Sequence, residues 1–271
     1  MKLFKDKLNQ RIEKFNTLLC IGLDSDKSKL PSSFTSQFKF NKAIIDKTHD
    51  LVCAYKPNTA FYEAQGVQGI KELKLTCDYL RENYPDIVII LDAKRADIGN
   101  TSESYAKFAF DYLGADSITL HPYLGKDALQ PFLDRKEKGS YILCKTSNPG
   151  AKDIQNLKVN SKPLYQILAN KIAGKWNENN NCGLVVGATY PAELAIVRKI
   201  APNLPFLIPG VGVQGGELDK SVGSGVDKNG KNAIINVARS IIFASKGRDF
   251  AEISRRETEK LKLEINKYRN G

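Results

Sequence analysis

Short apolar runs rich in β-branched residues recur along this chain, and each is followed by a longer stretch in which apolar residues repeat at helical spacing. Such short runs are typical of strands buried on both faces, and the longer stretches are typical of amphipathic helices. An amphipathic opening helix precedes the first run. Eight strands are predicted, at residues 17–23, 53–56, 88–91, 117–120, 141–146, 183–186, 206–209 and 233–237.

Alternation of strand and helix indicates a parallel α/β protein, because parallel neighbours need a crossover connection that is usually a helix. Eight such units favour a closed (β/α)8 TIM barrel, and an open doubly wound sheet is the alternative. No linker separates the units, so we expect a single barrel domain over residues 1–271. In a barrel the C-terminal ends of the strands meet at one rim, where active sites lie.

Composition narrows the class of protein. The chain is 42% hydrophobic and has no low-complexity tract, as expected for a globular protein. No apolar run approaches the roughly 20 residues that span a membrane, and the N-terminus lacks the apolar stretch of a signal peptide. We therefore expect a cytoplasmic protein without a membrane partner.

The cysteines are odd in number, widely spaced and without a C-x-x-C pair. Most of them lie in or beside strand-like apolar segments, where a free thiol behaves as a small hydrophobic group. A zinc site is disfavoured because the only two histidines, His49 and His121, have no ligand spacing to a cysteine. We expect structural thiols and no metal at Cys20, Cys53, Cys77, Cys144 and Cys182.

The net charge of +11 could indicate a nucleic acid, a membrane surface or an anionic substrate. The basic residues are spread along the whole chain, and arginines are not interleaved with aromatic residues. We therefore expect no nucleic-acid partner. A basic nucleic-acid-binding barrel without catalytic activity is the alternative from a different functional class.

The residues after the third predicted strand carry the densest chemistry in the chain. Asp92 and Lys94 alternate with period two and so project to the same side, and Asp97 follows after a short bend. Carboxylates on both sides of a lysine favour its ammonium form, which makes Lys94 a positioned acid. The alternative is a surface salt-bridge cluster at the start of the next helix.

Polar residues also follow most of the other predicted strands, which a set of unrelated surface salt bridges does not explain. They lie where the barrel rim is expected: Asp24, Lys56, Asn58, His121, Lys145, Ser147 and Arg239.

Residues 209–215 match the dinucleotide fingerprint G-x-G-x-x-G, but they occur in the seventh unit and no acidic residue lies at the required distance. In a barrel, glycines after strand seven and a cation after strand eight are the usual place for a phosphate. Arg239 can add a bidentate contact to that phosphate. The alternative is that Gly210 and Gly212 only form a turn.

The sequence Asp92-Ala93-Lys94-Arg95-Ala96-Asp97-Ile98 has the D-x-K-x-x-D-I pattern of the orotidine 5'-phosphate decarboxylases, and the chain resembles their longer, second subfamily. The resemblance extends through Cys20-Ile21-Gly22-Leu23-Asp24, Lys56-Pro57-Asn58, Thr146-Ser147-Asn148-Pro149, Pro209-Gly210-Val211-Gly212 and Arg239. It implies a cofactor-free decarboxylation of orotidine 5'-monophosphate to UMP and CO2, the last step of UMP synthesis.

The resemblance also implies roles for individual residues. Lys94 would donate a proton to C6, and Lys56, Asp92 and Asp97 would complete an alternating charged network. The residues implied in substrate binding are Asp24 with Lys56 at the ribose, Ser147 at the pyrimidine, Gln214 with Arg239 at the phosphate, and Asn58, Thr101, Gly210 and Gly212. The family is dimeric, and Asp97 and Thr101 would reach into the partner subunit's site.

A metal-dependent barrel acting on keto-sugar phosphates, as decarboxylase or aldolase, is the nearest alternative because it shares D-x-K-x-x-D. Those enzymes present an acidic metal ligand from strand two. This chain has Lys56 there, and a cation is a poor neighbour for Mg²⁺.

Overall fold

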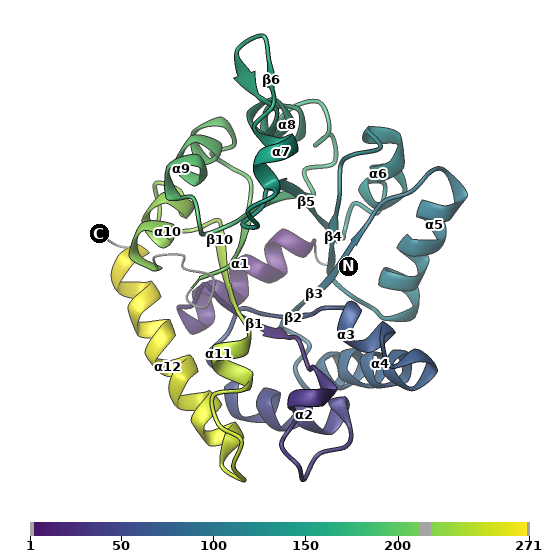
Figure 1. Ribbon diagram of the computed structural model, residues 1–271, viewed down its shortest axis with the longest axis vertical. Coiled ribbons are helices and arrows are strands. Elements are labelled where there is room, and N and C mark those ends of the chain that lie inside the picture. The colour runs from purple at the N-terminus through teal and green to yellow at the C-terminus, as the bar shows by residue number, and fades with distance from the viewer. Residues whose placement is uncertain (1–2, 212–217, 270–271) are drawn as a thin grey trace.

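The computed structural model describes residues 3–211 and 218–269, and their parallel strands close into a barrel surrounded by helices (Figure 1). The predicted (β/α)8 barrel is confirmed, and the open doubly wound sheet is wrong. The barrel strands are β1 (Leu19–Leu23), β2 (Ala54–Pro57), β3 (Val88–Arg95), β4 (Ser117–Leu120), β5 (Gly139–Lys145), β8 (Cys182–Val186), β9 (Phe206–Pro209) and β10 (Ala233–Val237).

The barrel closes between its first and last strands, where Cys20 of β1 is in register with Asn236 of β10. The strands are almost completely buried because apolar side chains fill the interior and the helices cover the outside. All five cysteines are free and buried, which confirms that they are structural.

The helices around the barrel follow from the amphipathic stretches of the sequence. They are α1 (Phe4–Phe15), α2 (Gln37–Thr48), α3 (Ala60–Glu63), α4 (Gly66–Asn83), α5 (Asn100–Ala106), α6 (Lys126–Leu133), α7 (Ala151–Gln155), α8 (Leu164–Ala173), α9 (Pro191–Ile200), α10 (Leu218–Gly225), α11 (Arg239–Ile242) and α12 (Phe250–Arg269). Short helical turns lie at Lys27–Lys29 and at Lys107–Tyr112, where α5 continues as a π-helix.

Helix α1 lies behind the strands in Figure 1 and covers the end of the barrel where the strands begin. Its Phe4 N–H donates to the carbonyl of Glu137 just before β5, and its Lys7 ammonium lies 2.7 Å from Asp116 just before β4. The opposite end, where the strands finish, is left open for a site.

Two local features differ from the sequence prediction. A small antiparallel hairpin, β6 (Lys158–Val159) with β7 (Lys162–Pro163), and helix α7 lie in a region where only a polar loop was predicted before a helix at residues 164–176. These elements are too short to give a periodic pattern. Strand β3 also runs on to Arg95, past its predicted end at Leu91.

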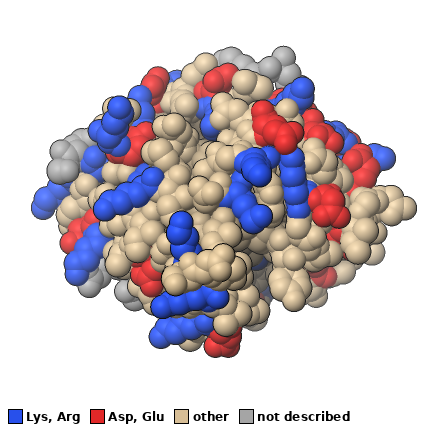
Figure 2. Space-filling model, turned by 90° about the horizontal axis from the view of Figure 1, so that it is seen from above, with Lys and Arg blue, Asp and Glu red and all other residues tan. Residues whose placement is uncertain are grey.

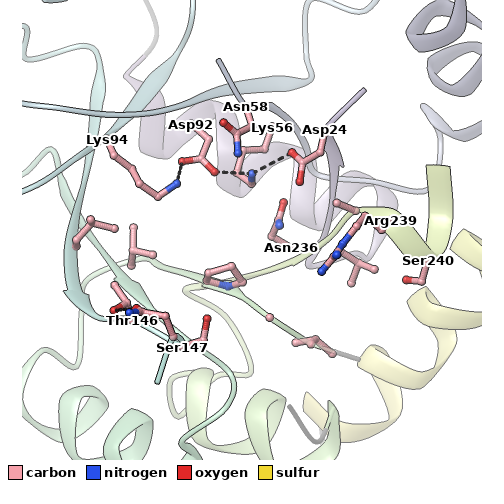
Figure 3. Close-up of a pocket in the computed structure, with 18 of the residues that line it drawn as sticks. Asp24, Lys56, Asn58, Asp92, Lys94, Thr146, Ser147, Asn236, Arg239 and Ser240 are labelled. Atoms are coloured by element: carbon pink, nitrogen blue, oxygen red, sulfur yellow. Dashed lines mark hydrogen bonds and ion pairs between the residues drawn. The ribbon is translucent and has the colours of Figure 1, made fainter. Parts of the chain in front are cut away.

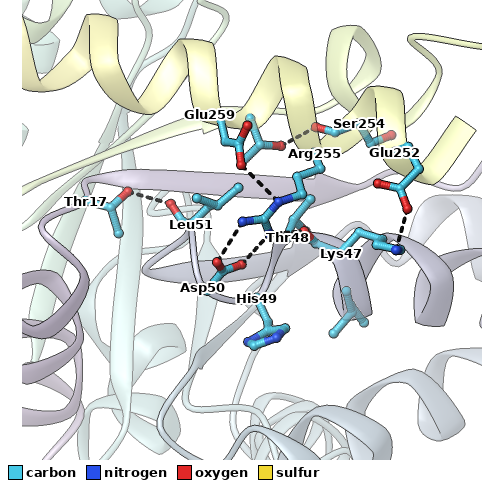
Figure 4. A network of polar contacts seen from close by, with 12 residues as sticks. Thr17, Lys47, Thr48, His49, Asp50, Leu51, Glu252, Ser254, Arg255 and Glu259 are labelled. Atoms are coloured by element: carbon cyan, nitrogen blue, oxygen red, sulfur yellow. Dashed lines mark hydrogen bonds and ion pairs between the residues drawn. The ribbon is translucent and has the colours of Figure 1, made fainter.

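Helix α12 is fastened to the turn after α2 by a network of ion pairs (Figure 4). The guanidinium of Arg255 donates to both carboxylate oxygens of Asp50, at 2.7 and 2.9 Å, and to the carbonyl of Lys47. Bidentate arginine pairs are geometrically specific, so this contact fixes where the last helix lies on the barrel.

Charged side chains are mixed on the face drawn in Figure 2, where lysines and arginines lie in separate groups among acidic and uncharged residues. That face carries no continuous basic tract. Among the described residues, no helix combines the length and the apolar character needed to cross a lipid bilayer.

A buried arginine joins the elements behind β9 and β10. The Arg198 guanidinium stacks on the Phe206 ring and donates to five carbonyls, those of Ala201, Pro202, Leu204, Gly225 and Asn232. Burial lowers the pKa of Arg198 to about 10, because the negative charge of Asp227 offsets only part of the loss of water. Its hydrogen bonds connect α9, the end of α10 and the start of β10.

Replacing this arginine tests the importance of those bonds. Arg198→Met should lower the free energy of unfolding by about 3 kcal/mol, because five carbonyls lose a charged hydrogen-bond donor. Urea denaturation measures the change, and the exposed Arg256→Met is the matched control. Equal stability of the two variants would contradict the assignment.

Candidate active site

A cavity of about 530 Å³ opens at the C-terminal ends of the strands. Eight of the predicted site residues line it, namely Asp24, Lys56, Asn58, Asp92, Lys94, Ser147, Gly210 and Arg239. Two others, Asp97 and Thr101, do not line it, and Gly212 and Gln214 lie outside the described residues. The strand ends therefore gather in space what the sequence separates by more than 200 residues.

The centre of the site is a row of alternating charges (Figure 3). The two Asp92 carboxylate oxygens face different lysines: Oδ2 lies 2.8 Å from Lys56 Nζ, and Oδ1 lies 2.6 Å from Lys94 Nζ. Asp24 continues the row beyond Lys56 at 3.8 Å. Lys56 is buried, but the Lys94 side chain is 49% exposed and so can reach a molecule in the cavity.

The backbone of β3 changes direction to present Lys94. The φ angle of Lys94 is 47°, a left-handed conformation that is uncommon outside glycine. The pairing of β3 with β4 also shifts register between Leu91 and Arg95. Thr119 of β4 stabilises this turn, since its Oγ1 accepts the N–H groups of Ala93 and Lys94 and donates to Asp92 at 2.9 Å. Such local strain is characteristic of functional sites.

The charges in the row stabilise one another unequally. Burial alone would raise the pKa of Asp92, but Lys56 and Lys94 outweigh burial and hold it well below its usual range. Burial would likewise lower the pKa of Lys56, and Asp92 and Asp24 instead raise it. Asp92 is therefore a carboxylate, and Lys56 is an ammonium, at neutral pH.

The pKa of Asp24 shifts in the opposite direction to that of Asp92. Burial raises its pKa, and the more distant Lys56 does not fully compensate. Its Oδ1, the oxygen nearer Lys56, is buried and accepts no hydrogen bond among the described residues, while the side chain as a whole is 20% exposed and lines the cavity. A hydroxyl group of a bound molecule can donate to the exposed part of this carboxylate.

The opposite wall of the cavity is built from the loop after β5. Thr146, Ser147, Asn148 and Gln155 all line it, and Gln155 bonds to both the N–H and the hydroxyl of Thr146, at 2.9 and 2.8 Å. This wall is uncharged and rich in amide and hydroxyl groups, which suits a polar heterocycle.

The third wall carries Gly210 and Arg239, two of the residues predicted to bind a phosphate. Gly210 has a φ of 95°, which only glycine adopts without strain, and it follows β9 directly. Arg239 is the first residue of the short helix α11, after β10, and points into the cavity (Figure 3). The glycine after the seventh barrel strand and the arginine after the eighth therefore line the same cavity, and their role in binding a phosphate stays a prediction.

Asn236 and Gln155 line the cavity, and Thr119 supports the row of charges, but none of the three was predicted from the sequence as a site residue. Asn236 interrupts the apolar run of β10, and a polar residue inside a buried strand was a usable signal. Thr119 gave no signal in the sequence, because threonine is common in strands and its hydrogen-bond partners come from the neighbouring strand. Gln155 lies in the segment where only a loop was predicted.

The predicted rim residues His121 and Lys145 do not line the cavity. Nε2 of His121 lies 3.1 Å from the carbonyl oxygen of Ala96, so the ring supports the turn after β3. Lys145 is buried behind the cavity wall.

The model of the orotidine 5'-phosphate decarboxylase / HUMPS family matches residues 17–252. The chain belongs to this family. Orotidine 5'-phosphate decarboxylases from Herpetosiphon aurantiacus and Cellvibrio japonicus are 49% and 46% identical to it, over 94% and 97% of this chain and 94% and 98% of their own. The resemblance drawn from the D-x-K-x-x-D-I motif is confirmed.

Solved structures agree with this membership of the orotidine 5'-phosphate decarboxylase family. The Leishmania donovani OMP decarboxylase superposes with a TM-score of 0.86 at 39% identity, covering 99% of this chain and 100% of that one. The Leishmania donovani UMP synthase gives 0.89 at 41% identity, and there the match covers 99% of this chain but 57% of the longer one.

In this family member, Asp97 and Thr101 lie beyond the end of β3 on the outer surface. Thr101 is exposed and Asp97 is partly exposed, where its Oδ1 accepts the N–H of Ile98. Within one chain they therefore lie outside the row of charges, and their place in a partner subunit's site stays a prediction.

Because the pKa values of Asp92 and Asp24 shift in opposite directions, the two carboxylates should affect the stability of the fold differently. The lowered pKa of Asp92 means that its ionisation stabilises the fold above pH ~4 and that this stabilisation is lost as the pH falls through the folded-state value. The raised pKa of Asp24 has the opposite sign, so its ionisation costs stability as the pH rises.

At pH 7, Asp92→Asn should therefore lower the free energy of unfolding by about 2 to 3 kcal/mol, because Lys56 stays buried without its close partner. Asp24→Asn should leave it unchanged or raise it by a few tenths of a kcal/mol. Urea denaturation at pH 7 and pH 4 measures both. A larger loss for Asp24→Asn than for Asp92→Asn would reverse the assignment.

Proposed function

We propose that the row formed by Lys56, Asp92 and Lys94 carries out the decarboxylation of orotidine 5'-monophosphate to UMP and CO2 without a cofactor. The reaction is that of the curated relatives, which are named orotidine 5'-phosphate decarboxylase and align over nearly the whole chain. One observation carries the assignment of residues: the Lys94 ammonium is half-exposed in the cavity and held 2.6 Å from Asp92.

Each of the three cavity walls fits one part of the substrate: the ribose, the pyrimidine or the phosphate. Asp24 and Lys56, with Asn58 beside them, suit the ribose hydroxyls, because they offer an acceptor carboxylate and a donor ammonium at the same cavity wall. Ser147 suits the pyrimidine. Arg239 and Gly210 suit the phosphate, and we include Gly212 and Gln214 in the phosphate site from the family resemblance.

Lys94 meets the main chemical difficulty of the reaction. Loss of CO2 leaves an electron pair on C6 that the ring does not delocalise, so a fixed positive charge beside C6 stabilises the developing carbanion. The same ammonium then gives its proton to C6, forms UMP, and regains a proton from water. Lysine needs no metal or organic cofactor for either role.

Asp92 holds Lys94 and places a negative charge close to it. A substrate carboxylate about 4 Å from Asp92 would be repelled by roughly 4 kcal/mol at an effective dielectric constant near 20. Binding of the distant phosphate can supply the free energy that brings such like charges together.

The metal-dependent keto-sugar phosphate enzymes are the second candidate in this superfamily. Their acidic ligand would come from the end of β2, where this chain has Lys56 paired with Asp92. No cluster of three or more His, Cys, Asp or Glu side chains in the described ranges, 3–211 and 218–269, could hold a metal ion. The identity of the strand-two residue favours the orotidine reaction.

We also propose that the enzyme is a homodimer of single-domain chains spanning residues 1–271, acts in the cytoplasm and binds no nucleic acid. Three large apolar side chains are exposed after two neighbouring strands: Ile98 after β3, at 67%, and Tyr123 and Leu124 after β4, at 84% and 38%. A second copy seated on this face would bury them and carry Asp97 and Thr101 towards the partner subunit's cavity.

Lys94→Ala should reduce turnover of orotidine 5'-monophosphate by about a thousandfold or more while leaving the protein folded, because it removes both the charge and the proton donor. The loss of substrate ultraviolet absorbance in excess EDTA measures turnover, and circular dichroism checks the fold. Near-normal turnover in Lys94→Ala would remove this residue from its role. Wild-type turnover that EDTA abolishes would point to the metal-dependent reaction.

The shared site predicts complementation between two inactive variants. Lys94→Ala and Asp97→Ala should each be inactive, but mixing and refolding them together should restore about a quarter of wild-type activity, since half of the dimers are mixed and one site in each is intact. Activity that stays at the level of the single variants would place both residues in the same subunit's site.

A further inference from the structure

Lys145 is a buried lysine that the proposed reaction does not use. It is the last residue of β5, it is 1% exposed, and it lies behind the wall formed by Thr146 and Ser147. Its ammonium is 5.6 and 5.0 Å from the ring centroids of Tyr165 and Tyr190. In the described part of the chain, no carboxylate lies within salt-bridge distance of it.

A charge buried without a carboxylate partner is costly, and aromatic faces recover only part of the cost. Within residues 3–211 and 218–269, its one hydrogen-bond acceptor is Asn156, whose Oδ1 accepts from Lys145 Nζ at 2.9 Å. Asn156 caps the C-terminal end of α7. The lysine therefore holds a specific point of the chain beyond the cavity loop.

That hydrogen bond lies beside a second cross-connection of the loop, and we call the two connections rungs: Lys145–Asn156 and Thr146–Gln155. Lys145 bonds to Asn156, and the next residue, Thr146, bonds to the residue before it, Gln155, through two hydrogen bonds. Two neighbouring residues at the start of the loop are thus tied in antiparallel order to two neighbouring residues at its end. The loop between them, residues 147–154, is closed like a ring.

The start of the loop also packs against the end of the neighbouring strand, β8. Gly187, just after β8, donates its N–H to the Lys145 carbonyl at 2.7 Å, and a Cβ built on it would come within 2.8 Å of Ser147. Ser147 is therefore held between the two rungs and a close backbone approach. Its position in the cavity depends on both.

We propose that Lys145 is a positioning residue for the pyrimidine end of the substrate: through Asn156 and the adjacent Thr146–Gln155 pair, it fixes the loop that presents Ser147 and Asn148 to the cavity. It touches no reacting atom. This proposal rests on the proposed function, because that function places the pyrimidine against this wall.

The test compares Lys145→Met with wild type. The methionine keeps an apolar stem of similar length and removes the ammonium. The KM for orotidine 5'-monophosphate should rise about tenfold, the effect of one charge-assisted hydrogen bond, while kcat changes less than about threefold because the row of charges is untouched.

Competitive inhibitors locate the defect. The inhibition constant of UMP, which has the pyrimidine, should rise about tenfold, and that of ribose 5-phosphate, which lacks it, should stay within about twofold. A general loss of structure would weaken both inhibitors alike. Equal weakening of both, or an unchanged KM, would overturn the proposal.

Matched variants separate the role of Lys145 from the general effect of removing a lysine. Lys5→Met removes a lysine that also donates to an asparagine, Asn180 at 2.7 Å, but at the opposite end of the barrel, and it should leave KM unchanged. Asn156→Leu should reproduce Lys145→Met, the double variant should be no worse than either, and Asn156→Asp, which keeps an acceptor, should retain the wild-type KM.

Wild-type turnover is read in the same assay. If wild type fails to consume orotidine 5'-monophosphate, the proposed function fails. If wild type is active and Lys145→Met behaves like Lys5→Met, only the positioning role fails.

Discussion

The site depends on Asp92, a buried carboxylate held between two ammonium groups at 2.8 and 2.6 Å. Without it, Lys56 would be a nearly isolated charge in the interior and Lys94 would have no fixed position. Because each charge is stabilised by the next, the protein keeps several ionised groups where water is scarce. The strain at Lys94 and the hydroxyl of Thr119 serve the same arrangement, since they turn the strand so that both lysines reach one carboxylate. Stability and reactivity are therefore set by the same few contacts.

Much of this could be predicted from the sequence because a parallel barrel converts order along the chain into position. The strand runs are long enough to read, and the rule that strand ends share a rim brought Asp24, Lys56, Asp92, Ser147 and Arg239 into one cavity. Local periodicity also placed Asp92 and Lys94 on the same side. What the sequence lacked was information on pairing between neighbours. Thr119 and Asn156 act through partners on other elements, and the hairpin at residues 158–163 is too short to produce a pattern.

The two ends of the cavity are built by different physical means. The row of charges is fixed by ion pairs between adjacent strands, which are rigid. The opposite wall belongs to a loop, and loops hold a defined shape only when something ties them down. The paired rungs at Lys145–Asn156 and Thr146–Gln155 supply that tie. A buried arginine, Arg198, has a comparable role behind the third wall, where it gathers carbonyls from α9, α10 and β10. In both places a basic side chain orders backbone that would otherwise be loosely held.

Closure of the barrel by β1 and β10 has a consequence for synthesis of the chain. Leu19 pairs with Ile235, so the sheet stays open until β10 has left the ribosome. The acid and ammonium groups of β1, β2 and β3 emerge early, whereas Asn236 and Arg239 emerge late and complete the cavity together with the final strand. A nascent chain would therefore carry a row of charges long before it could hold a phosphate. Contacts so distant in sequence form slowly, and the unpaired edges of the partial sheet are the surfaces that a folding chaperone would have to cover.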